Sequence, residues 1–316
     1  MLGARGIPQF NASNSFTKLY ALGYNKSVVA LADSLGGRFP NTRGAVLANS
    51  FETAVDASGR AIIKQIFSVF EFIGRASAIG YAAVRRIAMG DFSARDTLFQ
   101  MASAGVNSLP IVLITTSFSG AVLALYTAKT LTQWGVGSLV GGLVSLSVAR
   151  ELAPVLTAVV VAARAGSAIT AEIGTMKVTE QIDALRSLGA NPIKYLVAPR
   201  FVALVAMLPV LTMISMVIGS FGGYIVAQMN GVTGVAYLNS AQQWLTVYDV
   251  VMGLLKTVFF GAFIAIVGTQ QGLDAERGAA GVGKNTMNSV VISILLIYIS
   301  NYFLAYIMFG GNRPGF

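Results

Sequence analysis

The chain has 316 residues, of which 55% are hydrophobic and only 11% are charged, and its mean hydropathy is +0.69. A soluble fold needs more polar surface than this composition supplies, so we expect an integral membrane protein. The sequence contains no Cys and no His, which excludes disulfides, thiol nucleophiles, zinc-finger ligand sets and Ser-His or Cys-His catalytic pairs.

The net charge of +9 does not indicate a nucleic-acid partner. The basic residues are scattered at the ends of apolar segments, without a basic run or the alternation of basic and aromatic residues typical of nucleic-acid binding. In that position Lys and Arg anchor a chain to anionic lipid headgroups. We therefore expect no nucleic acid among the partners.

Residues 1–55 are rich in Ser, Asn, Gly and Ala, and Asp33 is their only acidic residue before Glu52. This composition argues against a packed domain and predicts a flexible polar extension. An uncleaved targeting segment is the alternative, because such segments are poor in acids and rich in Ser. A secretory signal is not indicated, since the stretch lacks a continuous apolar core.

Two amphipathic segments follow, within residues 56–105. From Ala61 to Ala88 an apolar face of helical spacing is interrupted by charged residues too often for a membrane span. A helix lying in the headgroup plane satisfies both halves of this pattern. A second, shorter amphipathic stretch runs from about Asp91 to Ala104.

Residues 106–311 predict an all-α permease-like domain with five membrane spans, since each apolar run approaches or exceeds the roughly 20 residues that cross a bilayer. The predicted spans are Val106–Ala128, Leu139–Ala163, Phe201–Ala227, Val247–Val267 and Val290–Phe309. The connections 130–140 and 228–246 contain no charged residue, whereas those before the third and fifth spans contain several basic ones. The positive-inside rule therefore places the N-terminus in the cytoplasm and the C-terminus outside.

The connection between the second and third spans, residues 166–200, is too polar to cross a membrane but is regularly patterned. Apolar residues recur at helical spacing at Val178, Ile182 and Leu185, and the charged residues Glu180, Asp183 and Arg186 fall on another face. Thr179 is placed to cap the start of this short helix and Gly189 to end it. Such a helix suits docking onto a partner protein, and packing against its own bundle explains the pattern equally well.

The same connection and its flanks resemble a known family. Residues 150–192 read RELAPVLTAVVVAARAGSAITAEIGTMKVTEQIDALRSLGANP, and LVAPR follows at residues 196–200. This region closely resembles the signature region of MlaE-family permeases, which include the bacterial YrbE proteins and their chloroplast relatives. The resemblance continues through the fourth span and into GAAGVGKNTMNSVVIS, so it covers about residues 60–311.

The resemblance implies a homodimeric permease that pairs with a cytoplasmic ABC ATPase and an MCE-domain lipid-binding protein and moves phospholipid or a related lipid. It implies a bacterial inner membrane or, alternatively, a plastid inner envelope as the location, and no cofactor on this chain. It also implies that residues 175–189 form a coupling helix in a groove of the ATPase. The candidate contacts to the ATPase are Thr179, Glu180, Ile182, Asp183, Leu185 and Arg186.

Three charged residues lie inside predicted spans: Arg150 and Glu151 in the second and Lys256 in the fourth. Each costs at least about 2.5 to 3.5 kcal/mol to insert, so each needs a partner or water. All three lie about ten residues, or roughly 15 Å, below the outer ends of their spans, so they could share one depth.

Two interpretations of these charges stay open and are compatible. Arg150 and Lys256 suit a lipid phosphate, with Glu151 tuning their charge, and in the family the Arg-Glu position borders the lipid pocket. Alternatively, Glu151 forms an internal ion pair that pins two helices together. Leu123 and Tyr126 are candidate contacts for the lipid acyl chains, although ordinary packing explains them as well.

Glycine patterns give two weaker signals. Gly137 with Gly141, and Gly219 with Gly223, have the small-xxx-small spacing that permits close helix approach, in this case at a dimer interface. Residues 278–285, GAAGVGKN, match the spacing of a phosphate-binding loop except at Asn285. They join two spans instead of following a strand, so we expect a Gly-rich turn with Asn285 or Thr286 capping the fifth span.

Other functions have less support in the residues. An ion-coupled secondary transporter or channel could use the same buried charges, but no inverted repeat or pair of broken helices indicates one. A membrane-embedded enzyme with Glu151 as its base lacks His, Cys or a carboxylate cluster. ATP hydrolysis is therefore expected on a partner chain, and this chain is expected to be a transport subunit.

Overall fold

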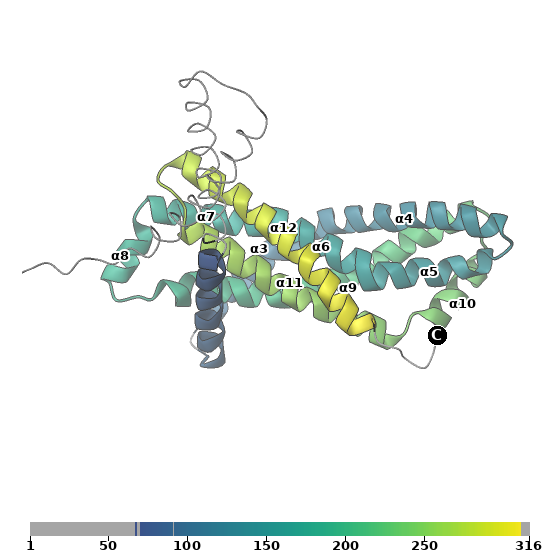
Figure 1. Cartoon of the computed structure of the whole chain (residues 1–316), viewed down its shortest axis with the longest axis horizontal. Coiled ribbons are helices and arrows are strands. Elements are labelled where there is room, and N and C mark those ends of the chain that lie inside the picture. The colour runs from purple at the N-terminus through teal and green to yellow at the C-terminus, as the bar shows by residue number, and fades with distance from the viewer. Residues whose placement is uncertain (1–66, 68–69, 91, 311–316) are drawn as a thin grey trace, which may run out of the picture. The chain divides into compact units, whose positions relative to one another are not determined.

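The computed structural model describes residue 67, residues 70–90 and residues 92–310. The predictions for residues 1–55 and for the first part of the amphipathic helix from Ala61 lie outside these residues. The chain divides into two units, residues 1–70 and residues 71–316, and the elements discussed below belong to the second. In the described part of the chain all regular structure is helical, which confirms the predicted all-α class (Figure 1).

The helices follow one another with short connections. Residues 70–88 are helical. The later α-helices are α3 (Ala94–Ala104), α4 (Leu109–Gln133), α5 (Val140–Ser147), α6 (Ala153–Val161), α7 (Ser167–Val178), α8 (Gln181–Ser187), α9 (Ala198–Met229), α10 (Gly234–Trp244), α11 (Val247–Leu273) and α12 (Ala279–Phe309). Three π-helical segments, η3 (Val148–Leu152), η4 (Ala162–Gly166) and η5 (Ile193–Val197), lie within or before the long helices, and η1 (Val106–Ser108) and η2 (Gly137–Leu139) are short 3₁₀ turns.

Among the residues that the structure describes, five helical segments are long and apolar enough to cross a membrane, which confirms the predicted number. They are Ala94–Gln133, Gly137–Val178, Ile193–Met229, Val247–Leu273 and Ala279–Phe309. The second segment has 42 residues. At 1.5 Å per residue it is roughly 63 Å long, about twice the thickness of a hydrocarbon core.

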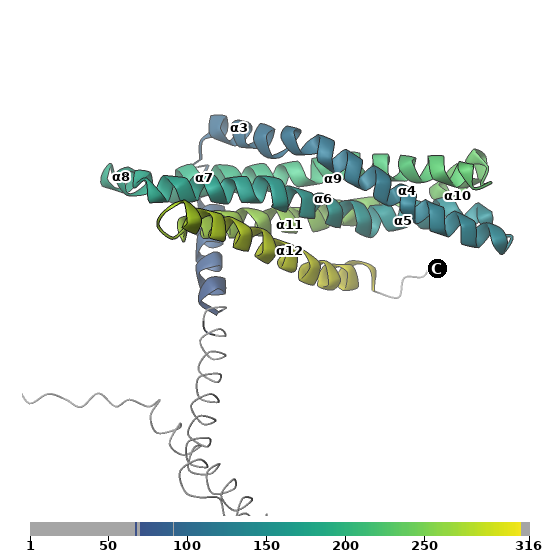
Figure 2. The same cartoon turned by 90° about the horizontal axis from the view of Figure 1, so that it is seen from above.

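The helices extend beyond the predicted spans, most of all at one end of the bundle, the end that carries α8 (Figures 1 and 2). The second span was expected to end at Ala163, but its helix continues to Val178, and the fifth begins at Ala279 instead of Val290. The physical reason is that hydropathy falls where the chain leaves the apolar core, whereas backbone hydrogen bonds carry the helix on as an amphipathic rod. We call this end the α8 end and the opposite one the α10 end.

The expectation of a Gly-rich turn at residues 278–285 is also wrong. Only Gly278, with φ of +86°, stands outside the helix as the N-cap of α12. Asn285 lies inside α12, where its Nδ2 donates to the carbonyl oxygen of Gln271 at 2.9 Å and ties α12 to the end of α11. Thr286 donates to the carbonyl of Val282 within the same helix. Neither residue caps it.

The closest packing is between α4 and α9, and it depends on glycine. A Cβ atom on Gly120 of α4 would clash with the backbone of Gly219 on α9, and one on Gly222 would clash with Ser117. Gly141 meets the backbone of Tyr237 on α10 in the same way. These small residues thus serve contacts within one chain, which corrects the expectation that Gly141 and Gly219 mark a dimer interface.

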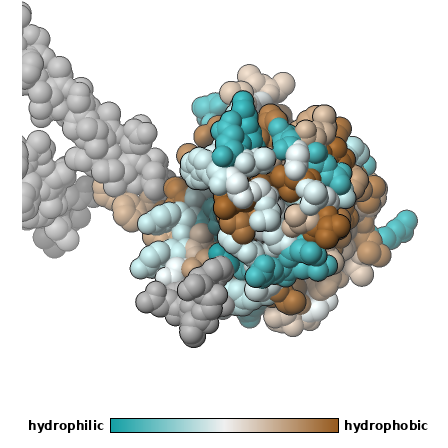
Figure 3. Space-filling view, turned by 90° about the vertical axis from the view of Figure 1, so that its right-hand side faces the viewer, coloured by the Kyte–Doolittle hydropathy of each residue, from teal (hydrophilic) through white to brown (hydrophobic). Residues whose placement is uncertain are grey.

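The apolar interior forms two clusters along the bundle. One, toward the α8 end, is built around Phe260 and Ile264 of α11 with Leu204 and Leu208 of α9. The other, toward the α10 end, is built around Val144 and Val148 with Met216 and Tyr237. Arg150 and Glu151 directly follow Val148 and Ala149 of the second cluster, and Lys256 stands about one turn before Phe260 of the first. The view onto the α10 end shows hydrophilic and hydrophobic residues interspersed, as expected where a bundle leaves the membrane (Figure 3).

The helix at residues 70–88 runs across the direction of the long helices in both views (Figures 1 and 2). The carbonyl of Phe72 accepts a hydrogen bond from buried Gln270 at 3.2 Å, and Arg75 pairs with Asp274 at 3.2 Å. Its other face exposes apolar side chains, Tyr81 and Val84 among them. Such an arrangement is the one expected of an amphipathic helix in the headgroup plane.

Candidate functional site

Arg150 and Glu151 lie in the π-helical segment η3, and the sequence explains this local distortion. Pro154 stands four residues after Arg150, and proline has no N–H to donate to the Arg150 carbonyl in an α-helical pattern. A π-bulge accommodates that loss within a continuous helix, and such bulges are frequent at functional sites. The Arg150 carbonyl instead accepts a hydrogen bond from the Lys256 ammonium at 3.0 Å.

Lys256 joins three helices through its buried ammonium. The side chain is fully buried on α11, and Nζ donates to Glu151 Oε1 at 2.7 Å and to Asn301 Oδ1 at 3.3 Å. Asn301 on α12 in turn donates to Glu151 Oε2 at 2.8 Å. The structure therefore brings the three predicted charges to one depth, and the predicted internal ion pair between Glu151 and Lys256 is present.

Arg150 has a separate partner in Asp249. Its Nε and Nη2 both contact Asp249 Oδ1 at 2.8 Å, and Asp249 is almost fully buried. The other carboxylate oxygen accepts hydrogen bonds from the backbone and hydroxyl of Thr246, so Asp249 also caps α11. Phe309 lies beside both cations, with its ring centre 4.7 Å from Arg150 Cζ and 5.0 Å from Lys256 Nζ.

Sequence reasoning missed Asp249, Asn301 and Phe309. Asp249 could have been predicted from the sequence, because Thr246-x-x-Asp249 has the spacing of a capping box. A capping box places a carboxylate at the start of a span. Asn301 and Phe309 carried none, since a single amide or aromatic residue in an apolar run does not reveal which helix it faces.

The charges of this network balance, and its burial is uneven. The cations Arg150 and Lys256 face the carboxylates Asp249 and Glu151. The side chain of Lys256 is 0% exposed and that of Glu151 42%, so the network is closed on the α11 side and open on the η3 side. Arg150 and Glu151 thus form the exposed edge of the network, and Lys256 lies on its buried side.

Leu123 and Tyr126 on α4 stand apart from the network. Leu123 packs partly buried against the cluster around Val144 and Val148. Tyr126 is 70% exposed on the outer face of α4. Within the described residues of one chain, the structure thus gives Leu123 a packing role and leaves Tyr126 facing the surroundings.

The short helix predicted within residues 175–189 is α8, but residues 175–178 belong to α7 and the caps differ from the prediction. Thr179 is the C-cap of α7, and its hydroxyl donates to the carbonyl of Thr175 at 2.8 Å, so the expectation that it caps the following helix is wrong. Glu180 occupies the N-cap of α8 in the left-handed conformation, with φ of 60°. Gly189, with φ of +73°, follows the end of α8, as predicted.

The two faces of α8 have different environments. Ile182 is 3% exposed and belongs to the apolar cluster around Phe260, and Leu185 is partly buried. The apolar face thus packs on the chain's own bundle. The charged face is outward, where Asp183 and Arg186 pair at 3.1 Å and Glu180 is exposed.

A comparison with known proteins decides the family. The family model described as Permease MlaE matches residues 97–307, about two thirds of the chain and all five long apolar helices in large part. This chain belongs to the MlaE permease family. Within it, the chain is the permease subunit of an ABC transporter and is not itself the ATPase.

Relatives of this MlaE-family permease occur in bacteria and chloroplasts. A "Probable ABC transporter permease protein" of Synechocystis is 46% identical over 227 residues, which are 72% of this chain and 86% of the relative. One of Rickettsia typhi is 43% identical over 246 residues, 77% of this chain and 91% of the relative. Protein TRIGALACTOSYLDIACYLGLYCEROL 1, chloroplastic, of Arabidopsis thaliana is 37% identical over 229 residues, 72% of this chain and 65% of the relative.

Proposed function

We propose that this permease moves phospholipid or a related lipid between its membrane and an MCE-domain partner, driven by a separate ABC ATPase. The observation that carries the proposal is the network around Lys256, whose Arg150–Glu151 edge is accessible at mid-depth in a bundle of apolar helices. A guanidinium at that depth suits a lipid phosphate. The Arabidopsis relative, which is named after a glycolipid, supports a lipid cargo.

The proposed working unit is a homodimer in which the α10 end of each chain lies on the outer side of the membrane. The loops there, residues 134–139 and 230–246, contain no Lys, Arg, Asp or Glu, whereas the connection from 164 to 200 is basic. This orientation puts α8 in the cytoplasm. Because related permeases come from bacteria and from a chloroplast, we propose a bacterial inner membrane as the location, with a plastid inner envelope as the alternative.

The charged face of α8 is the proposed contact with the ATPase. Glu180, Asp183 and Arg186 are exposed on it, together with the C-cap Thr179 of α7. Ile182 and Leu185 would act from inside, by fixing α8 to the bundle, so that a push on α8 reaches α7. Closure of two ATPase subunits would in this way narrow an outward cavity between two copies of the permease.

One purification tests the proposal. The tagged chain is extracted from its native membrane in mild detergent, and mass spectrometry identifies the proteins and lipids that accompany it. We expect an ABC ATPase and an MCE-domain protein in stoichiometric amounts, with phospholipid retained. A chain purified without the ATPase and without lipid would contradict the proposal and favour an ion-coupled transporter.

A further inference from the structure

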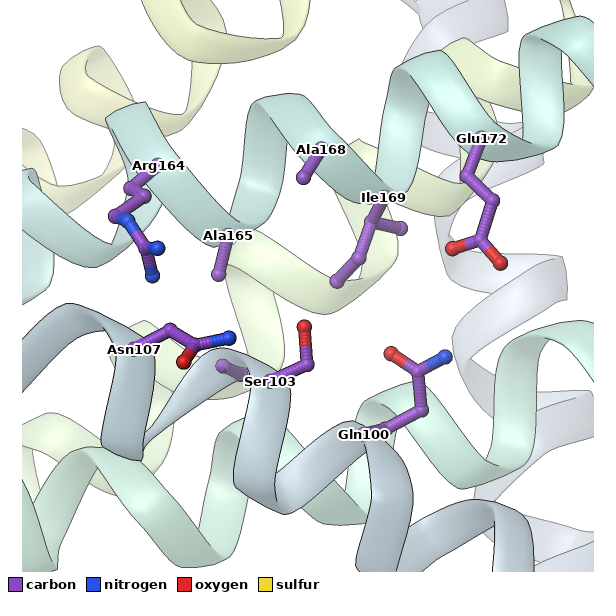
Figure 4. Close-up of a pocket in the computed structure, with 9 residues that line it drawn as sticks. Gln100, Ser103, Asn107, Arg164, Ala165, Ala168, Ile169 and Glu172 are labelled. Carbon is purple, nitrogen blue, oxygen red and sulfur yellow. The ribbon is translucent and has the colours of Figure 1, made fainter.

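A second polar site lies at the α8 end, well away along the bundle from the network around Lys256. It is a pocket of about 150 Å³ between α3 and the η4–α7 segment. Figure 4 shows the side chains of Gln100, Ser103 and Asn107 rising from α3 and η1 toward those of Arg164 and Glu172. A cavity of this volume has room for several water molecules and so for a small polar group.

The charge of this pocket is positive, because its acid is already paired. Glu172 contacts Arg200 at 2.8 Å, and Arg200, which is 4% exposed, also donates to the carbonyl of Leu196. Arg164 makes one hydrogen bond that the structure describes, from Nη1 to Ser108 Oγ at 3.3 Å. Its guanidinium therefore keeps donors for a ligand, and Asn107 and Ser103 lie opposite it across the pocket, with Gln100 farther along, opposite Glu172.

The depth of the pocket places it among lipid headgroups. Arg164 stands 27 residues after Gly137, where the second long helix begins, which is roughly 40 Å along the helix against a hydrocarbon core of about 30 Å. On α3, the other wall of the pocket, the large apolar side chains Leu98 and Phe99 are 66% and 73% exposed. Apolar residues exposed beside a polar pocket are typical of a helix that lies in a membrane interface.

We propose, on the basis of the orientation in the proposed function, that this pocket binds the phosphate of a phospholipid in the cytoplasmic leaflet. Arg164 binds the phosphate oxygens, while Gln100, Ser103 and Asn107 donate to the phosphate or to the hydroxyls of the headgroup. The acyl chains stay outside the pocket, in the leaflet. The site is separate from the accessible edge at Arg150, so the permease would hold lipid at two different depths along its bundle.

The test measures lipid binding to the full chain in detergent by native mass spectrometry. The probes are dioctanoyl phosphatidylglycerol, dioctanoylglycerol, which lacks the phosphate, and inorganic phosphate as competitor. Losing a hydrogen-bonded charge should weaken binding about 10-fold, so we expect Arg164→Gln to weaken one phosphatidylglycerol binding event by that factor. Arg277→Gln, which changes an exposed arginine of the same end, should leave it within about 2-fold.

Two further variants distinguish loss of this binding site from misfolding of Arg164→Gln and from binding at the Arg150 site. Ser103→Phe fills the pocket from an exposed position and should abolish the same binding event even if Arg164→Gln does not fold. Arg150→Gln should leave this event in place, whatever it does to lipid at the other site. Unchanged binding in both Arg164→Gln and Ser103→Phe would overturn the inference. Equal competition by inorganic phosphate would also overturn it, because the site would then be one for free phosphate.

Discussion

At the scale of single residues, the hydrogen bonds of the Lys256 ammonium offset the free-energy cost of burying it. An isolated ammonium in a low-dielectric interior would lose its proton or unfold its surroundings, but here Nζ has three oxygen partners within 3.3 Å. One of those partners, the Arg150 carbonyl, is the group for which Pro154 offers no N–H. Lys256 on α11 thus supplies the hydrogen bond to the Arg150 carbonyl that Pro154 does not donate.

The uneven burial of the ion pair predicts unequal effects of its two halves. Glu151→Leu leaves the fully buried Lys256 without its carboxylate, so we expect a loss of about 3 to 5 kcal/mol in the free energy of unfolding. Lys256→Met leaves Glu151, which is partly exposed and can be hydrated, so the loss should be smaller. The double variant should recover most of the loss. Unfolding in mixed micelles measures all three, and equal losses in the two single variants would contradict this account.

Arg150 is the cation on the accessible edge, so its replacement tests ligand binding. Arg150→Gln should lower the phospholipid retained by the purified complex several-fold, since a charged hydrogen bond contributes about 1.5 to 3 kcal/mol. Buried Asp249 loses its cation in this variant but keeps its hydrogen bonds from Thr246, so assembly with the ATPase should persist. Arg186→Gln, an exposed arginine paired with Asp183, is the matched control for lipid content. Unchanged lipid in Arg150→Gln would assign the network a purely structural role.

At the scale of elements, the second span is a rod with two built-in irregularities. The π-segments η3 and η4 carry Arg150 with Glu151, and Arg164, respectively. Each bulge turns the following residues relative to a regular α-helix, so the position of a bulge determines which way these charges face.

Pro154→Ala tests this link between bulge and charge. Alanine supplies the N–H that the Arg150 carbonyl lacks in an α-helical pattern, so η3 should revert toward α-helix and Lys256 should lose that acceptor. We expect the free energy of unfolding to change little, because the regained backbone hydrogen bond offsets the lost contact of Lys256, while lipid transport between vesicles falls several-fold. Pro209→Ala, which changes a proline inside α9, is the control. Full transport activity in Pro154→Ala would show that the bulge is dispensable.

The short helix α8 gives a second prediction at this scale. Glu180→Lys and Asp183→Lys reverse exposed charges without touching buried Ile182, so the fold should be unaffected. If this face contacts the ATPase, like charges placed in that contact should weaken it by a few kcal/mol. We expect ATP hydrolysis to become uncoupled from lipid transport, measured together in proteoliposomes. Normal coupled transport in the double variant would reject α8 as the coupling element.

At the scale of the whole bundle, small residues decide how close the helices come. In lipid, helices gain little from the hydrophobic effect and associate through tight packing, which glycine permits. The α4–α9 contact through Gly120 and Gly219 is the clearest case, because a side chain on either would meet backbone or a buried neighbour.

The same substitution should have opposite effects at two glycines. Gly120→Ala puts a methyl group against the backbone of Gly219, so we expect a loss of about 1 to 3 kcal/mol and less monodisperse protein. At Gly74, which is in the helix at residues 70–88, nothing lies within 4 Å of an added Cβ. Gly74→Ala should therefore stabilise the helix by about 0.5 to 1 kcal/mol. Thermal stability in detergent measures both, and a destabilised Gly74→Ala or a neutral Gly120→Ala would contradict the packing described here.

The sequence by itself determined the all-α membrane class, the five spans, the family and the three charges within the spans. These are local properties: an apolar run long enough to cross a bilayer, or a charge within it, is visible without knowing any neighbour. The pattern of residues 175–189 likewise predicted a short helix ending at Gly189.

Only the tertiary structure decided which groups meet. Lys256 pairs with Glu151 across 105 residues of sequence and Arg150 with Asp249 across 99, and such pairs depend on the rotation and depth of packed helices. The same dependence hid the pocket at Arg164 and the contacts of Gly141 and Gly219 within one chain. Hydropathy could not place the ends of the long helices either, because backbone hydrogen bonding continues beyond the apolar run that the membrane requires.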